Sequence, residues 1–240
     1  MPIHPDDPST KAPVHVSFLL DRSGSMASIR DDVIGGFNQF VRDQQKEPGT
    51  CRLTLVQFDS QEPFEVLTDA VDVREVRPLT AQRYVPRGGT PLLDAIGDLL
   101  DHAERRSRGR DEDPVVVVFT DGEENASQRW SHAAIFARVA RLEALGWTFV
   151  FLGANQDSYA EAGSLGFAPG STSNWAPADA ASAFGQTSRA VRSMRLKPQA
   201  ARVVQRRNFF EGVKEAEQAS PKQSKWRARF GGSASDPGSR

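Results

Sequence analysis

The stretch VHVSFLLDRSGSM, at residues 14–26, decides how the rest of the chain is interpreted. Its first seven residues are apolar except for His15 and Ser17, and such a short run is typical of a strand buried in a parallel sheet. The run stops at Asp21, and small polar residues follow it. The stretch therefore predicts a buried strand that leads directly into a polar loop.

A second stretch, DPVVVVFTDGEEN at residues 113–125, has the same form. Residues 114–120 contain four consecutive valines and a phenylalanine, which require shielding on both faces of a sheet. This strand also stops at an aspartate, Asp121. Both predicted strands thus end in a carboxylate.

The other segments alternate between helical and strand patterns. Apolar residues recur at helical spacing in residues 33–41, 91–102, 132–145 and 178–194. Strand patterns occupy residues 53–58, 64–67, 147–152 and 171–175. This alternation predicts an α/β fold: a doubly wound, mostly parallel six-stranded sheet with helices on both faces and residues 64–67 as a short antiparallel edge strand.

Length and charge suggest one domain with appendages. The 240 residues, of which 38% are hydrophobic, can bury one substantial core. Residues 195–240 contain 11 Lys and Arg against 4 Asp and Glu, a formal charge of +7 in a chain whose total is −1. We expect a disordered segment at 1–12, a domain at 13–194, and a basic tail at 195–240 that is partly helical and then disordered.

The compartment is predicted from what the sequence does not contain. The first residues have no secretory pattern, and no apolar run has the roughly 20 residues of a membrane span. Cys51 is the only cysteine, so an intrachain disulfide or a thiolate zinc cluster is excluded. We expect a cytoplasmic protein without a membrane span.

Oxygen-bearing side chains gather at the predicted strand ends. Asp21, Ser23 and Ser25 alternate along the first loop, Thr90 follows two glycines, and Asp121 ends the second stretch. In a doubly wound sheet, ligands bind at the carboxyl ends of strands where the winding reverses. Hard divalent cations prefer oxygen ligands, and two carboxylates with three hydroxyls leave Mg²⁺ partly neutralised and open to a further carboxylate.

The same residues resemble the metal-ion-dependent adhesion site (MIDAS) of the von Willebrand factor A domains. That pattern is Asp-x-Ser-x-Ser, a distant Thr and a distant Asp; here it is DRSGS at 21–25, Thr90 in GGTPLLD and Asp121 in TDGEEN. The resemblance covers about residues 13–194, and GANQD at 153–157 is similar to small cytoplasmic bacterial members.

This resemblance implies roles for individual residues. Ser23, Ser25 and Thr90 would bind Mg²⁺, or Mn²⁺ or Ca²⁺ in its place, through their hydroxyls, while Asp21 and Asp121 would act largely through water. A Glu or Asp of a partner protein would supply the last ligand. The predicted partner-binding rim comprises Met26, Arg87, Gly88, Gly89, Glu123 and Asn125.

Simpler interpretations exist for these residues. Residues 21–25 also suit a strand-end turn leading into a helix cap, and Thr90 suits a cap for the helix that follows it. Glu123 and Glu124 are treated as solvated loop residues. The four histidines show no metal-ligand spacing and receive no function.

The leading hypothesis is therefore a non-enzymatic, metal-dependent protein-binding module. The first alternative is a Mg²⁺-dependent phosphoryl-transfer or hydrolytic enzyme with Asp21 as nucleophile. Against it, Ser23 stands where an Asp-x-Asp phosphatase would have its second carboxylate, and no phosphate-binding Gly-rich loop is present. The second alternative is a nucleic-acid-associated protein that binds phosphate through the basic tail, including residues 225–230.

Overall fold

The computed structural model of the chain describes residues 12–154, 158–176 and 179–210. Within these ranges six strands form one sheet in the order β3-β2-β1-β4-β5-β6. The strands are β1 (Val14–Asp21), β2 (Cys51–Phe58), β3 (Glu65–Asp72), β4 (Asp113–Thr120), β5 (Thr148–Gly153) and β6 (Thr172–Asn174). All neighbours pair in parallel except β3, which is antiparallel to β2. The predicted doubly wound sheet is confirmed.

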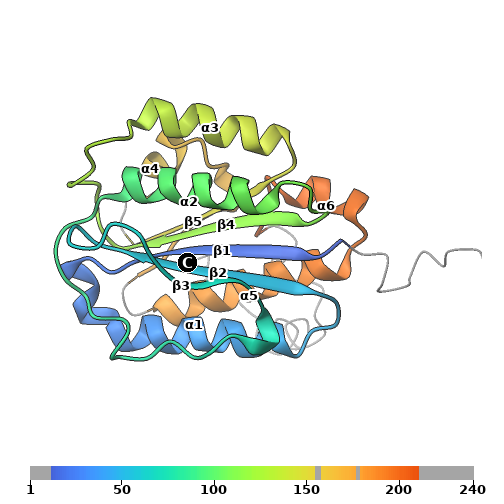
Figure 1. The fold of residues 1–240 in the computed structure, drawn as a ribbon, viewed down its shortest axis with the longest axis horizontal. Helices are drawn as coiled ribbons and strands as arrows, with labels where there is room; N and C mark the ends of the chain where they lie inside the picture. The colour runs from blue at the N-terminus through green and yellow to red at the C-terminus, as the bar shows by residue number, and fades with distance from the viewer. Residues whose placement is uncertain (1–11, 155–157, 177–178, 211–240) are drawn as a thin grey trace, which may run out of the picture.

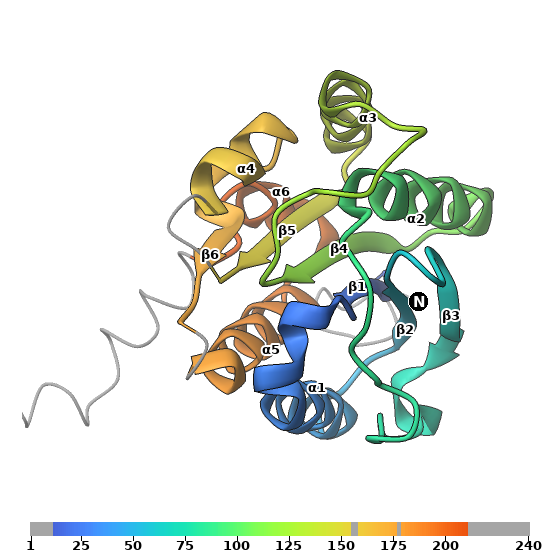
Figure 2. The ribbon, with the colours of Figure 1, turned by 90° about the vertical axis from the view of Figure 1, so that its left-hand side faces the viewer.

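Helices cover both faces of the sheet (Figures 1 and 2). One face carries α1 (Arg30–Gln45) and α5 (Ala180–Leu196), and the other carries α2 (Leu92–Ser107), α3 (His132–Ala144) and α4 (Ser158–Ser164). No helix in the described ranges is both long and apolar enough to cross a bilayer. The three-layer arrangement is the one that a parallel sheet requires, because its strands are apolar on both sides.

Alternate residues of β1 supply the two cores. Phe18 faces α1 and α5, where its ring lies 5.6 Å from that of Phe37 and 6.1 Å from that of Phe184, measured between centroids. Leu19 points the other way and joins the cluster formed with α2 and α3. Both side chains are fully buried. The continuous apolar run is thus explained by burial on two sides.

Some elements differ from their sequence-based predictions. The edge strand was predicted at residues 64–67 but spans Glu65–Asp72, because its half-exposed position lets Thr68 and Asp69 belong to it without an apolar pattern. Helix α2 continues to Ser107, five residues beyond the predicted end. Its last turn is polar and makes ion pairs with other elements, Glu104 with Arg138 and Arg106 with Asp69. Helix α4 was not predicted at all.

The packed chain continues past Met194, where the domain was expected to end. Arg195 is buried and donates to the carbonyl oxygens of Gln44 (2.7 Å) and Gly49 (2.9 Å). A further short helix, α6 (Gln199–Gln205), lies at the end of the sheet where β1 and β4 begin (Figure 1). Three of the basic residues assigned to the tail, namely Arg195, Arg202 and Arg206, thus make contacts inside the folded body.

Helix α6 is attached through a buried ion pair. The Arg202 side chain is 1% exposed; it contacts the carboxylate of Asp113 and donates to the carbonyl oxygen of Ala12 at 2.8 Å. Asp113 opens β4 and also receives a hydrogen bond of 2.9 Å from Arg206. Removing one partner of such a pair leaves a buried charge without compensation.

We expect Arg202→Met to lower the free energy of unfolding by about 3 kcal/mol, since Asp113 then keeps only Arg206. The matched control is Arg207→Met, in which the replaced side chain is 72% exposed; its effect should stay below about 0.5 kcal/mol. Urea denaturation measures both. Equal stabilities for the two variants would show that α6 does not depend on this ion pair.

Candidate metal centre

Two strand ends bring the predicted ligands together. β1 and β4 are parallel neighbours in a register that pairs Leu20 with Phe119. Asp21 is the last residue of β1, and Asp121 directly follows β4. Both therefore lie at the end of the sheet that faces the viewer in Figure 2. The winding of the sheet reverses at this position, between β1 and β4.

Asp21 lies beneath the loop rather than on its surface. Its side chain is fully buried; one carboxylate oxygen accepts from the backbone N–H of Ser23 at 2.7 Å, and the other from the hydroxyl of Thr120 at 2.6 Å. Burial raises the pKa of Asp21 to about 6, although these hydrogen bonds act in the opposite direction. Among the described residues, these bonds to the Asp21 carboxylate come from neutral donors, so its negative charge has no bonded cationic side chain.

The two serines link Asp21 to Asp121. The hydroxyls of Ser23 and Ser25 lie 3.1 Å apart, and that of Ser25 donates to Asp121 at 2.6 Å. Partial burial raises the pKa of Asp121 as well, against the effect of this hydrogen bond. The hydroxyls and carboxylates thus form one continuous cluster across two loops.

Thr90 completes the cluster with a hydroxyl that remains available. The residue is 2% exposed, and its backbone N–H and C=O bond with Asn125 at 2.8 and 3.1 Å. Its Oγ1 makes no hydrogen bond to any residue in the part of the chain that the structure describes. The capping role considered for Thr90 is filled by Glu124 and Ser127, which accept from backbone N–H groups of the first turn of α2.

Gly122 leaves a small space among these oxygens. A Cβ built on Gly122 would lie 2.8 Å from Thr90 Oγ1, 3.5 Å from Asp21 Oδ2 and 3.6 Å from Ser23 Oγ. Three predicted ligands from two segments, the β1 loop and the Thr90 segment, therefore lie near one point. A nearly buried hydroxyl without a partner and a cradle that a methyl group would fill both fit a bound cation.

The ligand chemistry fits a hard cation. Two carboxylates and three hydroxyls supply only oxygen, which Mg²⁺, Mn²⁺ and Ca²⁺ accept. Across the described ranges, no group of three or more His, Cys, Asp or Glu side chains is placed to hold a metal. A site here would therefore depend on its hydroxyls.

The predicted rim is only partly at the surface. Glu123 and Asn125 are exposed, and the Arg87 side chain is 40% exposed. Gly88 has a positive φ of 65°, and a Cβ there would meet Ser60 Oγ at 2.5 Å, so its glycine has a structural reason. Gly89 is partly exposed and donates to the same hydroxyl at 2.8 Å.

The assignment of Met26 to the rim is wrong. The short 3₁₀ helix η2 (Gly24–Ile29) turns this side chain inward, where it is fully buried in the same apolar cluster as Phe18. An apolar residue within a polar loop was the available signal for burial. Ser25, by contrast, remains exposed on the same turn.

A cavity adjoins the cluster on the side of β5. It has a volume of about 330 Å³, and its lining includes Asp121, Glu123, His132 and Glu161. His132 Nε2 lies 3.4 Å from a carboxylate oxygen of Glu161. The sequence did not indicate this pair, because the two residues come from α3 and α4 and meet only in the folded chain.

Glu124, treated as solvated, instead accepts hydrogen bonds from backbone N–H groups, including that of Ser127 at 2.7 Å.

Comparisons with known proteins agree with the fold. The sequence profile of the von Willebrand factor type A domain matches residues 15–189. No curated protein matches the chain. Among solved structures, manganese-loaded Plasmodium vivax TRAP protein is 20% identical with a TM-score of 0.54, and 71% of each chain is covered.

Two further structures show the same likeness. The vWF domain of the type V pili tip protein Mfa5 from Porphyromonas gingivalis is 15% identical, with a TM-score of 0.58 and coverage of 75% of this chain and 95% of that one. Proximal thread matrix protein 1 from the mussel byssus, solved with a zinc-occupied MIDAS motif, is 14% identical with a TM-score of 0.51. The match covers 73% of this chain but only 47% of the mussel protein. Identities this low show the fold alone.

Replacing Asp21 by asparagine is expected to stabilise the metal-free domain by about 1–3 kcal/mol above pH 7. Folding raises the pKa of Asp21 to about 6. The protonated carboxyl therefore stabilises the folded state of the wild type at low pH, and this stabilisation is lost as pH rises through about 6. The advantage of the variant should be absent near pH 4, where asparagine replaces a neutral acid. Urea unfolding in EDTA across this pH range measures it.

Added Mg²⁺ should reverse that order. It should stabilise the wild type and have little effect on Asp21→Asn, because that variant keeps only one of the two carboxylates, Asp121, to attract the cation. A variant that is less stable than the wild type at every pH would mean that the loops already compensate the charge of Asp21.

Gly122→Ala should lower Mn²⁺ affinity roughly tenfold or more, since the methyl group would occupy the cradle. The control is Gly35→Ala in α1, where an added Cβ meets nothing within 4 Å. That control should bind Mn²⁺ normally and gain about 0.5–1 kcal/mol of stability. Calorimetric titration compares the two, and unchanged binding by Gly122→Ala would place any cation elsewhere.

Proposed function

Because the chain belongs to the von Willebrand factor type A family, whose profile matches residues 15–189, we propose that it is a divalent-metal-dependent protein-binding module. Asp21, Ser23, Ser25, Thr90 and Asp121 would hold Mg²⁺, with Mn²⁺ or Ca²⁺ as alternatives. A glutamate or aspartate of a partner protein would complete the coordination. Zinc in the mussel protein and manganese in TRAP are properties of those proteins, and here they support only the choice of a divalent cation.

The observation that carries the proposal is the cradle at Gly122. Thr90 Oγ1 and the side-chain oxygens of Asp21 and Ser23 lie within 3.6 Å of the position that a Cβ of Gly122 would take. The cation would supply a positive centre that attracts a carboxylate. Since three of the five ligands are neutral, that centre keeps part of its charge for the partner.

The chain's own residues set the direction from which a partner approaches. Asp21 lies at the base of the cluster, fully buried, whereas Ser25 is exposed. Glu123 and Asn125 are exposed on the loop after Asp121, and Asp121 and Glu123 also line the adjoining cavity. A partner segment that presents an acidic residue would extend over this surface.

The geometry of Asp21 argues against the enzyme alternative. An attacking carboxylate must reach its substrate, but Asp21 is fully buried and both of its oxygens accept hydrogen bonds, from Ser23 and Thr120. His132 lines the same cavity as Asp121, but the acid that it contacts there is Glu161. We therefore favour a binding function.

The nucleic-acid alternative loses part of its basis. Arg195 and Arg202 are buried, and Arg206 bonds to Asp113, so these three cations serve the fold rather than a phosphate backbone. The aromatic and basic stretch at 225–230 lies outside the described residues. The structure thus offers no support for this alternative.

The test uses random peptides displayed on phage, selected against the protein in Mg²⁺ and in EDTA. We expect the Mg²⁺ selection to enrich peptides with Asp or Glu, and expect their binding to be lost in EDTA or when that acid becomes its amide. Ser25→Ala, at an exposed position, should lose peptide binding while its unfolding curve stays close to that of the wild type. Peptides that bind equally in EDTA, or that contain no acid, would contradict the proposal.

A further inference from the structure

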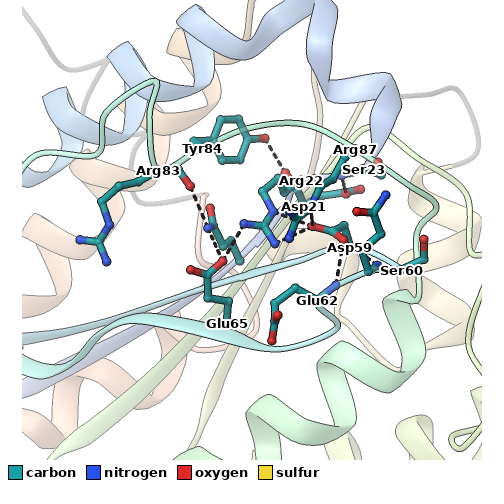
Figure 3. A network of polar contacts seen from close by, with 12 residues as sticks. Asp21, Arg22, Ser23, Asp59, Ser60, Glu62, Glu65, Arg83, Tyr84 and Arg87 are labelled. Carbon is teal, nitrogen blue, oxygen red and sulfur yellow. Dashed lines mark hydrogen bonds and ion pairs between the residues drawn. The ribbon is translucent and has the colours of Figure 1, made fainter.

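A buried aspartate outside the candidate metal centre binds the side chains of two arginines. Asp59 follows β2 and is fully buried. Its Oδ2 accepts hydrogen bonds from Arg22 Nε at 2.7 Å and Arg87 Nε at 3.1 Å, and Arg22 Nη2 lies 2.5 Å away (Figure 3). Its Oδ1 accepts from the backbone N–H groups of Gln61 at 2.7 Å and Glu62 at 2.9 Å. One carboxylate thus holds its own turn and two distant side chains.

The two arginines come from the loops that bear the predicted ligands. Arg22 stands between Asp21 and Ser23, and Arg87 lies three residues before Thr90. Ser60, which follows Asp59, binds the segment that contains Arg87 and Thr90: its N–H donates to the carbonyl oxygen of Gly89 at 3.0 Å. Residues 59 and 60 therefore connect the β1 loop, the β2 loop and the Thr90 segment.

Backbone contacts bring the two ligand-bearing loops into register. The N–H of Arg87 donates to the carbonyl oxygen of Arg22 at 2.8 Å, and the N–H of Gly24 donates to that of Gly88 at 3.0 Å. These bonds alternate along the loops, so a shift of one loop would break both. Asp59 binds the side chains of the same two arginines and thereby fixes their separation.

The carboxylate is ionised and satisfied where it lies. Burial alone would raise the pKa of Asp59, but hydrogen bonds from the backbone of Glu62 and Gln61 and the charge of Arg22 outweigh it and hold the pKa below its ordinary value. Arg22 has a second acidic partner, Glu65, at 2.6 Å. Within the described chain, Glu65 makes no hydrogen bond or ion pair with residues 87–90, although it feels the charge of Arg87. The two acids therefore share Arg22, but only Asp59 bonds to the Thr90 segment.

We propose that Asp59 is a positioning residue for the metal centre, which sets the distance between the Ser23–Ser25 loop and Thr90 through Arg22 and Arg87. The inference rests on the proposed metal-binding function. Mg²⁺ and Mn²⁺ accept little departure from their preferred ligand geometry, so a loop held in place before binding favours them. Partners of this outer layer contribute to metal affinity without touching the metal.

The first variant is Asp59→Asn. The remaining oxygen can still accept from Gln61 and Glu62, but the amide N–H₂ would face the donors of Arg22 and Arg87, so the change removes the links between loops. We expect Mn²⁺ affinity, measured by calorimetry, to fall about 10–100-fold. Glu65→Gln removes the same charge beside the same arginine, and its affinity should stay within about threefold of the wild type because that group is 39% exposed.

A second variant, Arg87→Gln, separates the effect of loop position on Mn²⁺ affinity from the effect of charge. It also serves as the test if Asp59→Asn does not fold. Removing a positive charge near a cation site should raise Mn²⁺ affinity by electrostatics alone. Positioning predicts the opposite, a fall of about tenfold. Tighter binding by Arg87→Gln, or an equal loss in Glu65→Gln and Asp59→Asn, would overturn the proposal.

A measurement without metal keeps this inference apart from the proposed function. In EDTA, amide hydrogen exchange of Gly24, Ser60 and Gly89 should be faster in Asp59→Asn than in the wild type, with β4 unchanged. If wild type does not bind Mn²⁺, the proposed function fails, and this exchange pattern still tests the positioning. Unchanged exchange at all three amides would show that Asp59 does not hold the loops, whatever the metal does.

Discussion

A buried carboxylate at the end of a fully buried strand is the constraint on which this end of the molecule depends. β1 is covered on both faces, so Asp21, its last residue, has no access to solvent. The carboxylate receives a backbone N–H from Ser23 and the hydroxyl of Thr120, and these bonds do not fully offset its burial, since its pKa remains raised to about 6. The loops around it are therefore arranged about a negative charge that calls for a positive partner. Under the proposed function, a divalent cation would be that partner.

Two layers of interactions surround that charge. The inner layer consists of hydroxyls and carboxylates around Gly122, with Thr90 Oγ1 left available. The outer layer is the buried contact of Asp59 with Arg22 and Arg87, in which one carboxylate binds two guanidinium groups and joins three loops. The two layers have different physical demands: the inner one needs ligands that remain free, and the outer one needs every donor and acceptor to be satisfied.

At the opposite end of the sheet, basic residues have a different use. Arg202 contacts Asp113 at the first residue of β4, and Arg195 donates to carbonyl oxygens in the last turn of α1 and just after it. A positive stretch can thus be part of a folded body when its guanidinium groups satisfy buried acceptors. Charge counted along the chain does not distinguish this use from a solvated tail, because the count contains no information on what lies across from each arginine.

The sequence by itself determined the sheet and the composition of the candidate centre. Continuous apolar runs such as residues 115–118 can only be buried on both faces, and the alternation with helical patterns then leaves few topologies, so the doubly wound sheet and the meeting of Asp21 with Asp121 could be predicted. The tertiary structure decided the contacts between segments that are distant in sequence. It turned Met26 inward, placed His132 beside Glu161 and joined Asp59 to Arg22 and Arg87. A periodic pattern records which face of an element is buried, whereas these contacts depend on how loops with no periodicity pack against one another.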